Sequence, residues 1–148
     1  MPVQRCRATW SAFVVLSVAL AATLSWSVGA GSARAEDKPY AVKDGKVDKA
    51  TYNGWRRYTE SCLRCHGPDG AGSSYAPDLV DSLKNMSEEE FNEVVVNGRQ
   101  NVSASSTSVM PPFGEVEDVM LYLSDIYAYL KARSDGVLGR GRPERFDR

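Results

Sequence analysis

The chain has 148 residues, of which 43% are apolar and 25% are charged. These values are ordinary for one small globular domain, and they exclude a wholly disordered, collagen-like or polytopic membrane protein. Residues 36–148 carry 15 basic and 19 acidic side chains, which argues against a nucleic-acid-binding protein because such a protein needs a basic patch. The three cysteines are too few for a disulfide scaffold.

The first 35 residues have the pattern of an export signal. Two arginines precede an uncharged run over residues 10–28, and Ala33-Arg34-Ala35 matches the small-x-small pattern of a cleavage site. The uncharged run is long enough for an uncleaved membrane anchor, but its Ser and Thr residues and the good cleavage site favour removal. We therefore expect a signal peptide over residues 1–35, cleaved after Ala35, and no membrane anchor.

The remaining chain divides by composition into three parts. Residues 36–47 are polar, with a Pro and a Gly, and predict a loose N-terminal leader. Residues 48–133 hold all the periodic sequence, and no alternating strand pattern is convincing there, so we expect an all-α domain. Residues 134–148 contain three Gly and four Arg and predict a flexible Arg-rich tail. Because the domain is acidic, we expect this cationic tail either to fold back on the domain or to contact a partner protein.

Two helices are predicted in the first part of the periodic region. The first covers residues 48–61 and begins with an Asp N-cap. The second begins at Ser87, where the sequence Ser-Glu-Glu-Glu forms a capping box, and it ends at Asn97 before a glycine. Met86 and Phe91 flank its start as a hydrophobic staple.

A third helix is predicted over residues 116–133. Its apolar side chains recur at helical spacing and form one stripe, in which methionine fills the core: Met120, Leu123, Ile126, Tyr127 and Leu130. The Gly-, Pro- and Ser-rich stretches 67–84 and 99–115 are predicted to be long loops. Loops of this length in a compact domain usually surround a ligand.

The ligand is indicated by the sequence Cys62-Leu-Arg-Cys65-His66. A CxxCH motif attaches haem c, because two thiols at this spacing reach the two vinyl groups of one porphyrin and the adjacent imidazole reaches the iron. A structural zinc site needs four ligands, and residues 36–148 hold only two Cys and one His. A thioredoxin-type redox pair expects a βαβ context that is missing, and a disulfide leaves the histidine unexplained. We expect one covalently bound haem c in the periplasm, because bacteria attach haem c outside the cytoplasm.

The axial ligands follow from the remaining candidates. His66 is the only histidine, so it is the proximal ligand and the distal ligand is a methionine. Met86 and Met120 have helix roles, whereas Met110 lies in a predicted loop before two prolines that stiffen the chain. His66 and Met110 together close both axial positions, which suits electron transfer and disfavours oxygen or peroxide chemistry. We therefore expect an electron-transfer protein rather than an enzyme.

The order of these features resembles the class I c-type cytochromes over residues 48–133. Gly54 and Tyr58 match the glycine and aromatic residue of the family's first helix, and residues 126–131 resemble its last helix. The resemblance implies that these two helices cross at the glycine. It also implies an all-α class I cytochrome c fold, with three to four helices around one covalently attached haem.

Two further segments resemble parts of this family that contact the haem. Ala-Pro77-Asp-Leu79 resembles the (G/A)PNL segment, which implies that the Pro77 carbonyl accepts a hydrogen bond from Nδ1–H of His66 and that Leu79 packs on the haem. Asn-Gly and Met110-Pro resemble the ends of the NGxxxMP segment. The stretch between them, residues 99–109, is unusually long and Ser-rich, and we interpret it as a partner-specific feature.

A narrower resemblance covers residues 54–84, 93–102 and 129–144. These segments are similar to methanol-metabolism-related cytochromes c, and most of all to the cytochrome partner of lanthanide-dependent methanol dehydrogenase. The resemblance implies a periplasmic carrier that accepts electrons from a dehydrogenase dependent on pyrroloquinoline quinone (PQQ) and passes them to another cytochrome or a terminal oxidase. We also expect the protein to be a monomer. It favours partner contact by the tail. Two alternatives remain open: a carrier for a different respiratory partner, and a haem enzyme or gas sensor with an open distal site.

Overall fold

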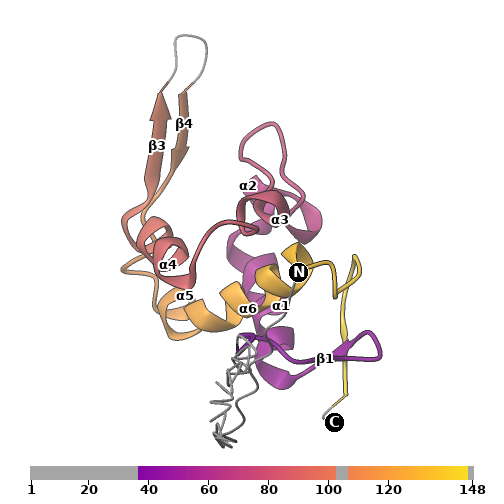
Figure 1. Cartoon of the computed structure of the whole chain (residues 1–148). Helices are drawn as coiled ribbons and strands as arrows, with labels where there is room; N and C mark the ends of the chain where they lie inside the picture. Colours follow the sequence, from indigo (N-terminus) through magenta and orange to yellow (C-terminus); the bar gives the residue numbers. More distant parts are fainter. Residues whose placement is uncertain (1–36, 103–106, 147–148) are drawn as a thin grey trace, which may run out of the picture. The chain divides into compact units, whose positions relative to one another are not determined.

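The computed structural model describes residues 37–102 and 107–146, so the expected signal peptide and its cleavage site lie outside the described residues. The described part is mostly helical (Figure 1). Its helices are α1 (Lys49–Ser61), α2 (Leu63–His66), the 3-10 turn η1 (Pro68–Gly70), α3 (Leu79–Ser82), α4 (Glu88–Asn97), α5 (Glu117–Leu121) and α6 (Leu123–Ser134). It also contains short strands, which the all-α expectation lacked: β1 (Val42–Lys43), β2 (Lys46–Val47), β3 (Arg99–Val102), β4 (Thr107–Met110) and β5 (Glu144–Arg145).

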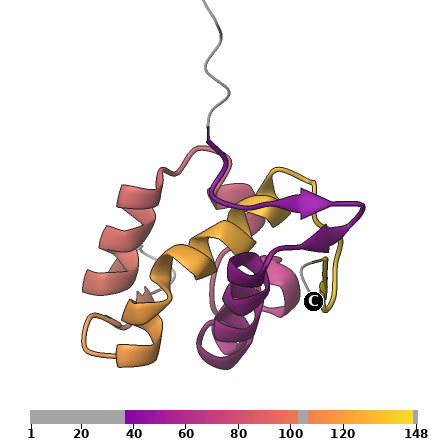
Figure 2. The ribbon, with the colours of Figure 1, turned by 90° about the horizontal axis from the view of Figure 1, so that it is seen from below.

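The centre of the fold is the crossing of α1 and α6, which Figure 2 shows. Helix α1 begins where the Asp48 side chain accepts a hydrogen bond from the Thr51 backbone N–H at 3.1 Å, as its sequence predicted. At Gly54 the two helices approach so closely that a Cβ atom would lie 1.8 Å from the backbone oxygen of Asp125. The crossing at the small residue that the family resemblance implied is therefore confirmed.

The hydrophobic core lies around this crossing and extends to α4 and α5. Helix α4 begins with the predicted capping box: Ser87 Oγ accepts from the Glu90 N–H at 3.2 Å, and Glu90 Oε2 accepts from the Ser87 N–H at 2.9 Å. The ring of Phe91 then packs 5.4 Å from that of Tyr127 on α6. Other side chains buried in this core are Tyr58, Leu83, Val95, Val119, Leu123, Ile126, Tyr129 and Leu130.

The helix predicted over residues 116–133 is instead two helices, α5 and α6, separated at Tyr122. The backbone of Tyr122 is not helical (φ −125°, ψ 24°). The Arg57 guanidinium of α1 stacks 4.4 Å from the Tyr122 ring centroid and pairs with Asp118 at 3.2 Å. Because α5 turns Val119 inward, Met120 is 37% exposed, and the expectation that Met120 fills the core is wrong.

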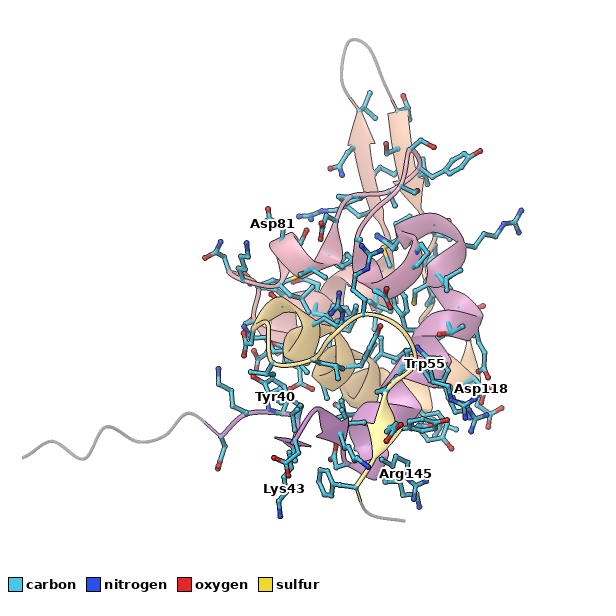
Figure 3. All side chains as sticks on the ribbon, turned by 90° about the vertical axis from the view of Figure 1, so that its right-hand side faces the viewer. Tyr40, Lys43, Trp55, Asp81, Asp118 and Arg145 are labelled. Carbon is cyan, nitrogen blue, oxygen red and sulfur yellow. The ribbon has the colours of Figure 1, made fainter. Side chains whose placement is uncertain are left out.

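The segments on either side of the helical domain form one small sheet in the order β1-β2-β5. Strand β2 pairs with β1 in antiparallel and with β5 in parallel orientation, and Lys46 and Glu144 form an ion pair of 3.1 Å across the β2–β5 pairing. Val47 is fully buried and Leu138 is 4% exposed. Figure 3 shows Lys43 of β1 and Arg145 of β5 in the same region of the molecule. The described residues of the leader and the tail, segments expected to be loose and flexible, are thus packed against the domain.

Asp135, directly after α6, fastens the leader to the domain. Its carboxylate accepts hydrogen bonds from Tyr40 Oη at 2.6 Å, Lys38 Nζ at 3.0 Å and Lys131 Nζ at 2.7 Å. Burial opposes ionisation of this carboxyl, but the three donors outweigh that effect and hold its pKa well below the usual range.

Strands β3 and β4 form an antiparallel hairpin that projects from the helical domain (Figure 1). It replaces most of the long loop predicted over residues 99–115. The pairing places Arg99 opposite Met110 and Asn101 opposite Ser108. Its outer valines, Val102 and Val109, are 74% and 59% exposed. In the part of the chain that the structure describes, no helix has the length and apolar character needed to span a membrane.

Candidate haem-binding site

A cavity of about 470 Å³ lies between α2, α3, α4, α6 and the hairpin. Cofactor sites have volumes of about 300–1,000 Å³ and are lined mainly by apolar side chains. The apolar lining here comes from elements far apart in the chain and includes Leu79, Phe91, Val95, Phe113, Leu123, Ile126 and Leu130. All six site residues that the sequence proposed border this cavity: Cys62, Cys65, His66, Pro77, Leu79 and Met110.

The two cysteines reach the cavity because α1 ends at Ser61 and α2 begins at Leu63, so that Cys62 is the single residue between the two helices. The backbone N–H of His66 donates to the Cys62 carbonyl at 3.0 Å, so the motif forms one helical turn and its cysteine and histidine side chains border one cavity. The two cysteines do not form a disulfide. The pKa of the Cys62 thiol is raised to about 11, mainly because the thiol is buried and to a smaller extent because Cys65 lies nearby.

His66 is held from behind by a backbone carbonyl. The ring is 7% exposed, and its Nδ1 lies 3.1 Å from the carbonyl oxygen of Pro77. When Nδ1–H donates to that oxygen, the neutral ring keeps its free electron pair on Nε2, the arrangement that a metal-ligating histidine needs.

The loop after His66 leaves no room for a side chain at its first residue, Gly67. Gly67 has φ +72°, and a Cβ there would lie 2.3 Å from the Gly72 carbonyl oxygen. The same loop closes through a hydrogen bond of 2.8 Å from the Gly72 N–H to the His66 carbonyl. Tyr58 Oη donates to the Gly67 carbonyl at 2.5 Å from below. Glycine is therefore required immediately after the histidine.

Met110 reaches the cavity from the hairpin. It is the last residue of β4, is half-buried, and is followed by two prolines. Gly98, at the opposite foot of the hairpin, has φ +72°, and a Cβ there would lie 2.5 Å from the Met110 carbonyl oxygen. The Phe113 N–H then donates to the Val95 carbonyl at 2.9 Å, which ties the segment back to α4.

The other two methionines of the described chain differ in their relation to the cavity. Met86 also borders it, and the Met86 carbonyl accepts a hydrogen bond from Tyr127 Oη at 3.3 Å. Met120 is exposed on α5 and is not among the lining residues. Met86 is therefore the alternative candidate to Met110 for the distal axial ligand.

The rim of the cavity is polar, and most of it was not predicted. Arg99, Asn101 and Ser108 of the hairpin border the cavity together with Tyr75, which is 76% exposed. Arg99 is the one cationic side chain among the described lining residues. Sequence reasoning missed it because its place depends on the pairing of β3 with β4.

These residues fit haem c. Two cysteines at CxxC spacing could supply the sulfurs for thioether bonds, and a histidine whose Nδ1 lies near the Pro77 carbonyl could supply an axial nitrogen. A methionine from another element borders the same apolar space. A cation at the polar rim suits the carboxylates that haem carries.

Comparison with known proteins gives consistent results. The profile of the family described as cytochrome c oxidase, cbb3-type, subunit III matches residues 49–130. The chain is 50% identical to cytochrome c-553I of Paracoccus denitrificans over 111 residues, which are 74% of this chain and 49% of that protein. It therefore spans about half the length of that relative.

Two further proteins are similar over more of their length. The chain is 43% identical to cytochrome c-555 of Methylococcus capsulatus over 100 residues, covering 67% of this chain and 75% of that protein. The crystal structure of the c-type cytochrome XoxG from Methylobacterium extorquens AM1 matches with a TM-score of 0.66 and 48% identity, covering 74% of this chain and 67% of that one.

Proposed function

The chain belongs to the c-type cytochromes, and from this premise we propose that it carries single electrons from a PQQ-dependent methanol or alcohol dehydrogenase to another cytochrome or a terminal oxidase. As a c-type cytochrome it binds haem c covalently and is an electron-transfer protein, not an enzyme. The donor, the acceptor and the residues that hold the haem are parts of the proposal.

The proposed haem contacts follow from the cavity. When bound, the haem supplies an iron that cycles between the ferric and ferrous states by one electron. Cys62 and Cys65 would hold it by thioether bonds, and His66 and Met110 would be the axial ligands. The Pro77 carbonyl orients His66, and Leu79 contributes to the apolar wall. The observation that carries the electron-transfer role is that His66 and Met110 border one apolar cavity from separate elements, since a doubly ligated iron leaves no open position for oxygen or peroxide.

The proposal places the protein in the periplasm as a monomer. The support is the export pattern of residues 1–35 together with the CxxCH motif, because haem c attachment occurs outside the cytoplasm in bacteria. We propose that the mature chain begins at Glu36 and that residues 48–133 form the haem domain, with the leader and the tail as its flanking segments.

The choice of donor rests on the sequence resemblance to methanol-metabolism-related cytochromes c. That resemblance includes residues 129–144, which extend beyond the last helix into the tail. The tail is folded against the domain through the pairing of β5 with β2. We therefore propose that it contacts the donor as an ordered part of the surface and not as a flexible arm. Small redox interfaces dock weakly and exchange quickly, which suits a carrier that must leave its donor after each electron.

Stopped-flow reduction of the ferric protein tests the donor. We expect a purified PQQ-dependent methanol dehydrogenase to reduce it at least about tenfold faster than dehydrogenases that use other cofactors, with reduction by a small inorganic reductant as the control for redox competence. Reduction only by a donor from another respiratory chain would leave the electron-carrier role intact and overturn the proposed partner. Rapid binding of cyanide or carbon monoxide, with peroxidase activity, would instead indicate an open distal site.

A further inference from the structure

A segment after the last helix packs against the residues that follow His66. We name residues 67–72 the proximal loop and residues 138–146 the C-terminal strap. Within the strap, Leu138 and Pro143 are buried, and β5 pairs with β2. We propose that the C-terminal strap positions His66 by fixing the proximal loop, with Asp69 as the residue that joins them. This inference rests on the proposed role of His66 as an axial ligand.

Asp69 carries the contacts between the two segments. Its Oδ1 accepts from the backbone N–H of Gly141 at 2.9 Å, and its Oδ2 accepts from Arg140 Nε at 3.2 Å. The Asp69 side chain is only 11% exposed, although that of Arg140 is 71% exposed. Hydrogen bonds to a shielded carboxylate of this kind contribute more than an ion pair between two exposed side chains.

The backbone of Asp69 shows that the loop needs this support. Its φ is +61°, in the left-handed region that residues other than glycine adopt at a cost. Such a conformation persists only where the surroundings determine it. Besides the strap, Arg133 of α6 contacts the loop, because its Nε donates to the Asp69 carbonyl at 3.4 Å. Arg133 also donates through Nη1 to the Leu138 carbonyl at 2.5 Å and so links the loop and the strap.

Hydrogen bonds connect the C-terminal end of the proximal loop, three residues after Asp69, to the ring of His66. The proximal loop closes where the Gly72 N–H donates to the His66 carbonyl at 2.8 Å. The next turn closes where the Ser73 N–H donates to the Ala76 carbonyl at 2.9 Å, directly before Pro77, whose carbonyl lies 3.1 Å from His66 Nδ1. A shift of the loop therefore changes the hydrogen bond between the Pro77 carbonyl and the imidazole of His66. That bond raises the basicity of a ligating histidine and so tunes the metal.

The strap offers a matched control within the same chain. Glu144 pairs with Lys46 at 3.1 Å and holds the strap to β2, and neither residue belongs to the proximal loop. Glu144→Gln therefore weakens the strap's attachment to the sheet without removing a contact to Asp69. Asp69→Asn and Arg140→Gln both remove the ion pair at the loop, and Arg140→Gln alters only an exposed side chain, so it should fold even if the first variant does not.

The holoprotein variants are compared by amide hydrogen exchange of residues 67–72, by the proton resonances of the His66 ring and by redox titration. We expect Asp69→Asn and Arg140→Gln to raise exchange in the proximal loop about tenfold, to shift the His66 resonances, and to raise the ferrous-to-ferric ratio at a fixed dye potential about threefold, because the weakened hydrogen bond makes the ligand less basic. Glu144→Gln should match the wild type in all three.

Two results would overturn the proposal. In the first, both loop variants lower the melting temperature but leave the His66 resonances and the redox titration as in the wild type, so that the strap only adds stability. In the second, exchange in the proximal loop does not change. Failure of the His66 assignment is a separate outcome, because it would appear in the wild-type holoprotein as the absence of resonances from an iron-bound histidine.

Discussion

The two walls of the haem cavity are built in different ways. The proximal wall, residues 62–77, consists of helical turns and tight loops whose hydrogen bonds join residues close in sequence, and the core and the C-terminal strap cover it. The distal wall is formed by the paired strands β3 (Arg99–Val102) and β4 (Thr107–Met110), which are largely exposed. The comparison shows that the position of His66, one proposed axial ligand, depends mainly on contacts within residues 62–77, to which the C-terminal strap adds support. The position of Met110, the other proposed ligand, depends on strand pairing and on the attachment of the hairpin to α4.

The largest expected effect is on the proximal wall. Gly67→Ala adds a Cβ within 2.3 Å of the Gly72 carbonyl oxygen at a residue with φ +72°. Strain of this kind costs about 1–3 kcal/mol before the clash is counted, so we expect the free energy of unfolding to fall by about 3 kcal/mol or more in denaturant titrations followed by circular dichroism. Gly139→Ala, where a Cβ meets no atom within 4 Å, is the control. Equal stability of the two variants would contradict the tight proximal loop.

The equivalent change on the distal wall should act differently. Gly98→Ala adds a Cβ within 2.5 Å of the Met110 carbonyl oxygen, also at φ +72°. The hairpin buries few side chains and can shift outward, so we expect a loss of only about 1–2 kcal/mol in stability together with a weaker iron–sulfur charge-transfer band. A loss as large as that of Gly67→Ala, with the band unchanged, would show that the hairpin is no more adaptable than the proximal loop.

The same contrast explains how much of the fold the sequence could predict. The helices α1 and α4 were predicted because Asp48 and the Ser87 capping box act on their own neighbours. The break between α5 and α6 at Tyr122 was missed because its ring stacks on Arg57, a residue far away in the sequence on α1. Strands β1, β2 and β5 contain two residues each and have no periodicity to detect. The hairpin strands Arg-Gln-Asn-Val and Thr-Ser-Val-Met lack alternation of apolar and polar residues.

The residues of the candidate site also differ in how far the sequence could predict them. The CxxCH spacing is set by the chemistry of haem attachment, so Cys62, Cys65 and His66 could be proposed without knowledge of the fold. Pro77 and Leu79 required the resemblance to a family. Arg99 could not be found, because only the pairing of β3 with β4 places it opposite Met110 at the rim of the cavity.

A smaller effect is expected outside both walls, and it serves as a reference for them. The pKa of Asp135 is lowered in the folded protein, so its carboxylate adds stability above the ordinary carboxyl pKa of about 4, and this stability is lost as the pH falls below that value. Asp135→Asn should therefore lower the free energy of unfolding by about 1–2 kcal/mol at pH 7, and the difference from the wild type should shrink in more acidic buffer.

Thermal unfolding of the two proteins from pH 7 down to pH 3 measures this effect. Asp81→Asn is the control, because Asp81 pairs with Lys84 at 2.9 Å between two exposed side chains and should contribute little. Neither variant should alter the haem spectrum. A difference between Asp135→Asn and the wild type that grows on acidification would contradict the stated role of the carboxylate.

The central claim, that His66 and Met110 close the iron from two separately built walls, is tested most directly by the near-infrared spectrum of the ferric holoprotein. We predict an iron–sulfur charge-transfer band in the wild type, in Met86→Leu and in Met120→Leu, and its loss in Met110→Ala with a fall in midpoint potential on the order of 100 mV, within the range of about 0.8 V that axial ligands set. A band that persists in Met110→Ala and disappears in Met86→Leu, the other methionine of the cavity, would contradict the account.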